Sequence, residues 1–114
     1  MKVVKKGLGT LYTPPGHDDA VSAVKLFNPG NGCTKVDVHI TTFAPSSGMD
    51  EEVHPASDHV LHLLEGSLEV RQGGKAAALL EAGDTVHIPA GEPHQVVNSS
   101  GKSAVFLAVT VPPV

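Results

Sequence analysis

The chain has 114 residues and a formal net charge of −4, with eight lysine and arginine residues against twelve aspartate and glutamate residues. Eight basic residues are too few to form the basic stripe that binds phosphates, so we expect no nucleic-acid partner. No segment approaches the roughly twenty apolar residues that cross a bilayer, and residues 1–16 lack the apolar run of a secretory signal, so we expect a cytoplasmic protein without membrane contact.

The length predicts a single domain spanning residues 1–114, because it lies near the commonest domain size. Twelve glycines and nine prolines, together with 40% hydrophobic residues, are typical of a turn-rich globular chain. The lone cysteine, Cys33, cannot form an internal disulfide. Seven histidines are unusual in a chain with one tyrosine and no tryptophan, and they suggest a use for imidazole.

The first half of the chain predicts strands, since no long stretch has the apolar spacing of a helix. We expect edge strands around residues 3–4 and at residues 21–27. Residues 36–43 alternate between two faces. One face carries Val36, Val38, Ile40 and Thr42, and the other carries Asp37, His39, Thr41 and Phe43. This alternation predicts a half-buried strand.

The second half of the chain repeats short strands between turn residues. We expect strand over residues 60–70 with a break at 65–67, a hairpin loop at 72–75, and then strands at 76–80, 85–88, 94–98 and 104–111. The corner at residues 89–93 contains two prolines, which cannot donate to a strand ladder. Nine or ten short strands without intervening helices predict an all-β sandwich or jelly roll.

Three potential metal ligands lie close together in the centre of the sequence. Glu52 and His54 are two residues apart, so on an extended strand their side chains leave the same face. His59 begins the next predicted strand, on the face that it shares with Leu61 and Leu63, which we expect to point into the core. If both segments turn these faces inward, the three donors converge.

Five residues in the second half of the chain recur at a characteristic spacing: Gly83, Pro89, Gly91, His94 and Asn98. This spacing is the second motif of the cupin superfamily, which the region between residues 43 and 109 resembles. The positions of the first motif are held here by Glu52, His54, His59 and Gly66. This resemblance implies a double-stranded β-helix, or jelly-roll barrel, and one bound metal ion.

The first motif departs from the family pattern in one respect. Glu52 stands where the family has its first histidine, and His59 stands where the family has a glutamate. The inventory of three histidines and one carboxylate is unchanged, so the resemblance implies one divalent transition metal (Fe, Mn, Ni, Cu or Zn) bound by Glu52, His54, His59 and His94. Asp58 is an alternative source of the carboxylate, or a partner that orients a histidine. A polar barrel without metal is the other alternative.

The remaining histidines, His17, His39, His62 and His87, are interpreted as ordinary core or surface residues, with His62 and His87 on the outer faces of their strands. No residue stands out as a dedicated general base. Tyr12 and His39 are the two side chains that we consider as candidates to approach the cavity, without assigning a role to either.

Two classes of function are compatible with this sequence. The resemblance implies a metal-dependent enzyme, of the dioxygenase, decarboxylase, isomerase or lyase type, that acts on a small oxygen-rich substrate. The alternative is a binding or sensing module that holds a metal or a small molecule without chemistry. Because small barrels leave sheet edges open and cupins commonly pair, we also expect a homodimer.

Overall fold

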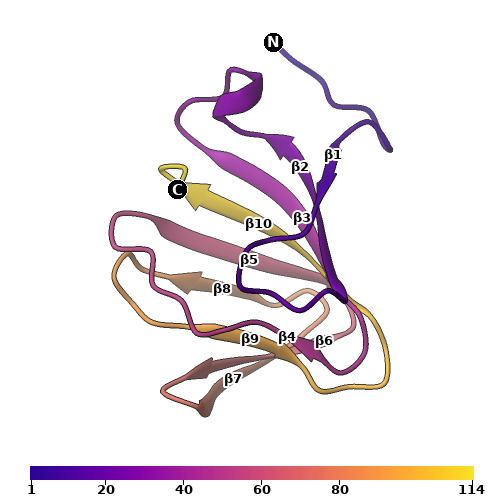
Figure 1. Ribbon diagram of the computed structural model, residues 1–114, viewed down its shortest axis with the longest axis vertical. Helices are drawn as coiled ribbons and strands as arrows, with labels where there is room; N and C mark the ends of the chain where they lie inside the picture. Colours follow the sequence, from indigo (N-terminus) through magenta and orange to yellow (C-terminus); the bar gives the residue numbers. More distant parts are fainter.

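The computed structural model describes residues 1–114 as two facing antiparallel sheets (Figure 1). The larger sheet has the strand order β1-β2-β3-β10-β5-β8, and its strands are β1 (Thr10–Tyr12), β2 (Val21–Phe27), β3 (Asp37–Phe43), β10 (Ala104–Val111), β5 (Asp58–Glu65) and β8 (Thr85–Ile88). The smaller sheet has the order β4-β9-β6-β7, with β4 (Ser47–Gly48), β9 (Gln95–Asn98), β6 (Ser67–Gln72) and β7 (Lys75–Glu81). A short 3₁₀ turn, η1 (Pro29–Asn31), is the only helical element, and it is far too short to span a membrane.

The predicted all-β, double-sheet fold is confirmed, and most predicted strands lie within a residue or two of the observed ones. The edge strand predicted at residues 3–4 is wrong, because the chain there has no strand and β1 forms at Thr10–Tyr12 instead. The predicted break at residues 65–67 is confirmed at Gly66, which separates β5 from β6 with φ +78°. A Cβ at this position would lie 2.5 Å from the carbonyl oxygen of Ser103, so the site requires glycine.

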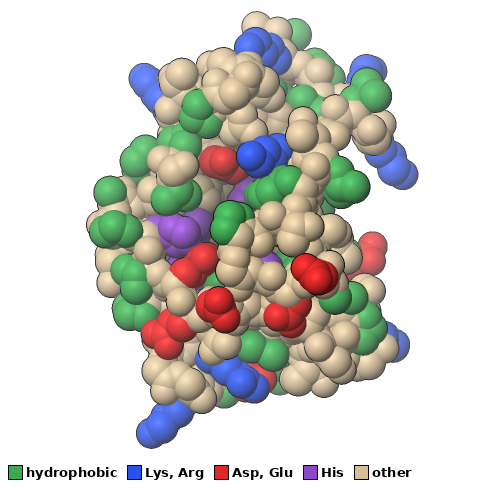
Figure 2. Space-filling model, in the orientation of Figure 1, with side chains coloured by type: hydrophobic (Ala, Val, Ile, Leu, Met, Phe, Trp, Pro, Cys, Tyr) green, Lys and Arg blue, Asp and Glu red, His purple; other side chains and the backbone are tan.

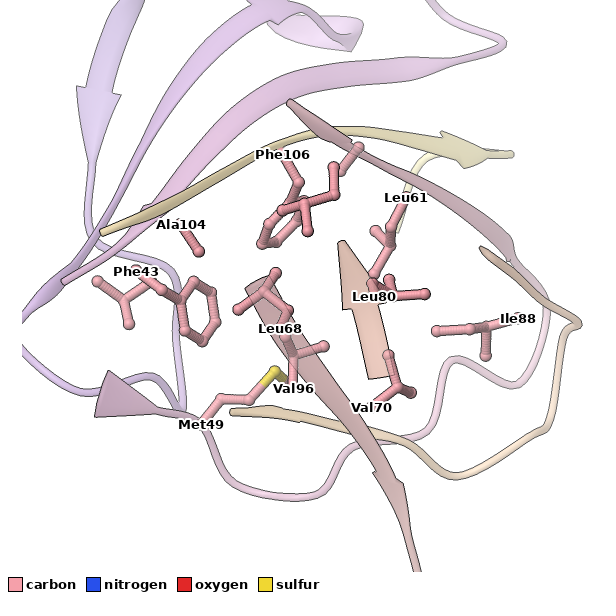
Figure 3. Close-up of a cluster of buried hydrophobic side chains, with 13 residues drawn as sticks. Phe43, Met49, Leu61, Leu68, Val70, Leu80, Ile88, Val96, Ala104 and Phe106 are labelled. Atoms are coloured by element: carbon pink, nitrogen blue, oxygen red, sulfur yellow. The ribbon is translucent and has the colours of Figure 1, made fainter. Parts of the chain in front are cut away.

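The core fills space between the two sheets (Figure 3). It is built from alternate residues of the strands, as expected for sheets with one buried face. Both aromatic members, Phe43 and Phe106, come from the larger sheet, and their ring centroids lie 5.7 Å apart. The cluster consists of Val21, Phe43, Met49, Leu61, Leu63, Leu68, Val70, Leu80, Ile88, Val96, Ala104, Phe106 and Ala108.

Strand β10 lies at the centre of the larger sheet and aligns the inner faces of its two neighbours. Thr110 is paired with Asp37 of β3 on one side and with His59 of β5 on the other. One step along, Ala108 is paired with His39 and with Leu61. These two rows place the polar Asp37, His39, Thr110 and His59 on the inner surface of the sheet, next to Ala108 and Leu61 of the apolar core.

Candidate metal centre

The four predicted ligands come from three segments that the barrel brings together. Glu52 and His54 lie in the loop between β4 and β5, His59 lies on β5, and His94 immediately precedes β9. The backbones of Glu52 and His94 are paired by two hydrogen bonds of 2.9 and 3.0 Å. The loop is also held by the amide of Gly91, which donates to the carbonyl of His54 at 2.9 Å. Backbone pairing therefore fixes the two loops against each other before any ligand is considered.

The side chains of these residues converge on one point. The ring nitrogens of His54, His59 and His94 that face each other all lie within 4.8 Å of one another. The Oε1 atom of Glu52 lies 3.0 Å from Nε2 of His54 and 3.6 Å from Nε2 of His94. The structure therefore brings together the four residues named from the sequence, and their role as metal ligands stays a prediction.

The donor atoms fit a small divalent ion. Two ligands that each lie about 2.1 Å from one ion are about 3.0 Å apart at a right angle and about 3.4 Å apart in a tetrahedron. The separations between Glu52 and its two neighbours span this range. His59 Nε2 is buried and has no hydrogen-bond partner, which is costly for a polar atom unless something else binds there. A bound metal ion would satisfy it.

Hydrogen bonds at Nδ1 of His94 and His59 set which nitrogen of each neutral ring carries the lone pair. His94 Nδ1 donates to the carbonyl of Glu92 at 3.2 Å, so in the neutral ring Nε2 carries the lone pair. His59 Nδ1 lies 2.9 Å from the hydroxyl oxygen of the buried Thr110. When Nδ1–H of His59 donates a hydrogen bond to this hydroxyl oxygen, Nε2 of His59 likewise carries the lone pair. Such partners fix the tautomer and orientation of histidine ligands in metal sites.

The electrostatics of the cluster favour an ionised Glu52 and a neutral His59, which are the states that ligands need, but they favour a protonated His94, which must lose its proton to bind a metal. Burial raises the pKa of Glu52, but hydrogen bonds from His94 and His54 outweigh it and lower that pKa to about 2. Burial, reinforced by the nearby His54 and His94, lowers the pKa of His59 to about 4, so this imidazole is neutral at physiological pH. Burial opposes protonation of His94, yet the hydrogen bond with Glu52 leaves its pKa above the ordinary value.

Asp58, the alternative carboxylate, lies outside this cluster. Its side chain is half exposed, with one oxygen 2.9 Å from His87 Nε2 and the other accepting from the amide of Ala90 at 2.9 Å. Asp58 precedes His59 on β5, so strand alternation turns it to the opposite face. His62 also faces outward, where its Nδ1 lies 2.7 Å from Thr85 Oγ1. The outward placement of His62 and His87 agrees with the prediction.

The cluster forms part of the wall of a cavity of about 360 Å³. Figure 2 shows histidine side chains recessed in one face of the molecule, with acidic and basic side chains beside them. The interpretation of His17 and His39 as ordinary residues is incomplete, because both line the cavity, as does Tyr12. Asp37 and Thr110 line it too and were not predicted. The sequence did indicate that Asp37 and His39 point inward, because they lie on the same strand face as the apolar Phe43.

The double-sheet barrel and the histidine cluster define a cupin: residues 39–110 match the cupin domain, so the chain belongs to this family. This match agrees closely with the region of resemblance in the sequence. The chain is similar to the tetracenomycin polyketide synthase protein TcmJ of Streptomyces glaucescens, which is 33% identical over 85 residues, or 74% of this chain. The chain spans 56% of the length of that relative.

Solved structures share the fold over almost the whole chain. The polyketide cyclase RemF from Streptomyces resistomycificus superposes with a TM-score of 0.84 at 24% identity, covering 99% of this chain and 80% of RemF. A predicted oxalate decarboxylase from Thermotoga maritima superposes with a TM-score of 0.83 at 21% identity, covering 99% of this chain and 100% of that protein. At these identities the two structures show the fold alone.

Proposed function

We propose that this protein is an enzyme that depends on a divalent transition metal and acts on a small, oxygen-rich, enolisable substrate bound in the cavity. The observation that carries the proposal is His59 Nε2, which is buried, lacks a hydrogen-bond partner and lies with the facing nitrogens of His54 and His94. The cavity combines apolar side chains with converging polar groups, and small-molecule sites use polar groups of this kind to orient the ligand.

In this proposal Glu52, His54, His59 and His94 hold the metal. When bound, the ion supplies Lewis-acid stabilisation of negative charge that develops on a substrate oxygen. The chain itself contributes the fixed imidazole orientations described above. Its apolar side chains Leu61, Val96 and Phe106 also line the cavity, where they exclude water and contact the carbon skeleton of the substrate.

The relatives narrow the substrate class within this proposal. TcmJ is named as a polyketide synthase protein and RemF as a polyketide cyclase. We infer that the substrate is a compound with several carbonyl or phenolic oxygens, and that the reaction begins with removal of a proton next to a carbonyl group. A cavity of about 360 Å³ lies at the lower end of the range for small-molecule sites, about 300–1,000 Å³.

The test combines metal analysis with a proton-exchange assay. Elemental analysis of freshly purified protein should find close to one transition-metal ion per chain. Zinc-loaded protein in D₂O should speed the exchange of the terminal methyl hydrogens of 1-phenylbutane-1,3-dione, followed by proton NMR. His59→Ala should abolish both properties, whereas His62→Ala on the outer face should change neither. Metal-loaded protein that binds such ligands tightly without turnover would instead identify a binding or sensing module.

We also propose that the protein forms a homodimer, which the exposed sheet edges support. Leu11 on the edge strand β1 is 71% exposed, and Leu8 just before it is 75% exposed. An apolar edge of this kind is normally covered by another chain or a loop. Light scattering of the purified protein should give twice the monomer mass, and a monomer mass would disprove the pairing.

A further inference from the structure

A second polar cluster lies in the same cavity, across the sheet from the histidine site. His39 Nδ1 lies 2.9 Å from Asp37 Oδ1, and both side chains are largely buried. The ring of Tyr12 packs edge-on against the ring of His39, with centroids 6.3 Å apart. Lys25 lies over the Tyr12 ring at 4.5 Å. None of these four side chains forms a hydrogen bond with the proposed metal ligands, yet all of them line the cavity.

The strand register fixes the distance between the two clusters. Asp37 and His59 are both paired with Thr110, and His39 and Leu61 are both paired with Ala108. Each cluster is therefore one strand away from β10, on opposite sides, which separates their backbones by about 10 Å. Between them, β10 carries Ala108 and Thr110, which also line the cavity. A flat substrate in the cavity would extend across β10 and reach both clusters.

The chemistry of the second cluster suits proton transfer. With Asp37 accepting from Nδ1–H, neutral His39 presents the lone pair of Nε2, and the carboxylate stabilises the imidazolium that forms on protonation. Burial, with a smaller contribution from Asp37, raises the pKa of Tyr12 to about 12. Tyr12 therefore keeps its proton and can donate a hydrogen bond. The cluster combines a base, a residue that orients it, and a neutral donor.

We propose that His39 is a catalytic acid–base residue for substrates held at the histidine site, with Asp37 as its positioning residue and Tyr12 as a hydrogen-bond donor to the reacting carbonyl. This inference rests on the proposed function. The substrate is bound at one end by the site formed by Glu52 and the three histidines, and its next carbonyl unit lies beside His39. The substrate class is therefore a molecule with at least two carbonyl or enol groups spread over several carbon atoms.

The proposed step balances without any further reactant. A C–H bond next to a carbonyl breaks, and its proton goes to Nε2 of His39. The electron pair of that bond forms the carbon–carbon double bond of an enolate, and the negative charge moves to the carbonyl oxygen, where Tyr12 donates a hydrogen bond. The imidazolium then returns the proton to a carbon or an oxygen of the product, so His39 ends in its starting state.

The experiment uses the full-length zinc-loaded protein and compares His39→Asn with the matched control His62→Asn on the outer face of β5. His39→Asn should keep wild-type zinc stoichiometry but lose about 10²- to 10⁴-fold in the exchange rate of 1-phenylbutane-1,3-dione, the range typical of a general base. Asp37→Asn should lower kcat with little change in KM. His62→Asn should exchange at the wild-type rate.

A second readout does not depend on turnover. Nitrogen-15 NMR of the histidine rings should show His39 protonated at Nδ1 in the wild type and a mixture of tautomers in Asp37→Asn. Binding of the diketone should shift the Nε2 signal of His39. An unshifted His39 signal, or wild-type exchange by His39→Asn while His59→Ala is inactive, would overturn this inference and leave the proposed function standing. Failure of the wild-type protein to bind zinc or to exchange the diketone would overturn both.

Discussion

Replacement of Thr110 by valine tests whether the orientation of His59 matters for metal binding. Thr110 is 1% exposed, and its hydroxyl is the partner of His59 Nδ1 at 2.9 Å. Valine has nearly the same shape but no hydroxyl, so a buried ring nitrogen loses its partner. The free energy of unfolding of the metal-free protein should fall by about 1–3 kcal/mol. Because the ring is no longer held in one tautomer and orientation, zinc affinity should fall by about 10- to 100-fold.

The two effects are measured separately for Thr110→Val. Urea unfolding in the presence of a chelator gives the stability of the metal-free protein, and calorimetric titration with zinc gives the affinity. Thr42→Val is the matched control, because Thr42 lies on β3 with its side chain on the outer face, opposite to the buried Thr41 and Phe43. Thr110→Val protein that loses stability but binds zinc as tightly as the wild type would refute the link between the hydroxyl and the metal.

Three further predictions follow from single side chains. Glu52→Gln should weaken zinc binding by at least about 10-fold. In the metal-free protein, NMR should show that the same substitution lowers the pKa of His94, because the hydrogen bond with Glu52 raises that pKa. Ultraviolet absorbance should show that Tyr12, the only tyrosine, ionises near pH 12. Asp37→Asn should lower this midpoint but keep it above the ordinary value of 10, because burial raises the pKa of Tyr12 more than Asp37 does. Gly66→Ala should destabilise the fold by more than Gly74→Ala in denaturant unfolding. Both glycines have a positive φ, which costs an alanine about 1–2 kcal/mol, but only at position 66 does the added Cβ also lie against the carbonyl oxygen of Ser103.

The strands and their faces could be predicted wherever apolar and polar residues alternate strictly. His59, Leu61 and Leu63 are all buried on one face of β5, as the alternation indicates. The N-terminal edge could not be predicted in this way. The β-branched pair at residues 3–4 is intrinsically suited to a strand, yet β1 forms at Thr10–Tyr12, where Tyr12 pairs with Ala23 of β2. Edge strands depend on the partner that the fold offers more than on local preference.

The residues of the candidate metal site could be predicted as a group because they are close in sequence or belong to a recognisable motif. Glu52, His54 and His59 lie within eight positions of one another, and His94 was added by the resemblance. The second cluster was not predictable as a unit. Asp37 and His39 share one strand face by alternation, but their meeting with Tyr12 depends on the register of three strands, β1, β2 and β3. Nothing in the sequence fixes that register before the sheet forms.

The interpretation that Glu52 and His59 have exchanged places relative to the first motif of the family predicts a consequence for substrate choice. Position 59 is 8% exposed as a residue, whereas the Glu52 side chain is 32% exposed. A neutral imidazole therefore occupies the deeper position, and the carboxylate occupies the one with better solvation, which lowers the cost of burying charge. The negative charge then lies on the more accessible side of the site.

We expect this charge to disfavour small dianionic ligands relative to neutral ones, because like charges repel most strongly where solvent is partly excluded. Zinc-loaded protein should accordingly bind neutral 1-phenylbutane-1,3-dione more tightly than oxalate in calorimetric titrations at one ionic strength. Glu52→Gln with zinc added to saturation should narrow that preference by improving oxalate binding. If the wild type prefers oxalate, the position of Glu52 does not select the substrate.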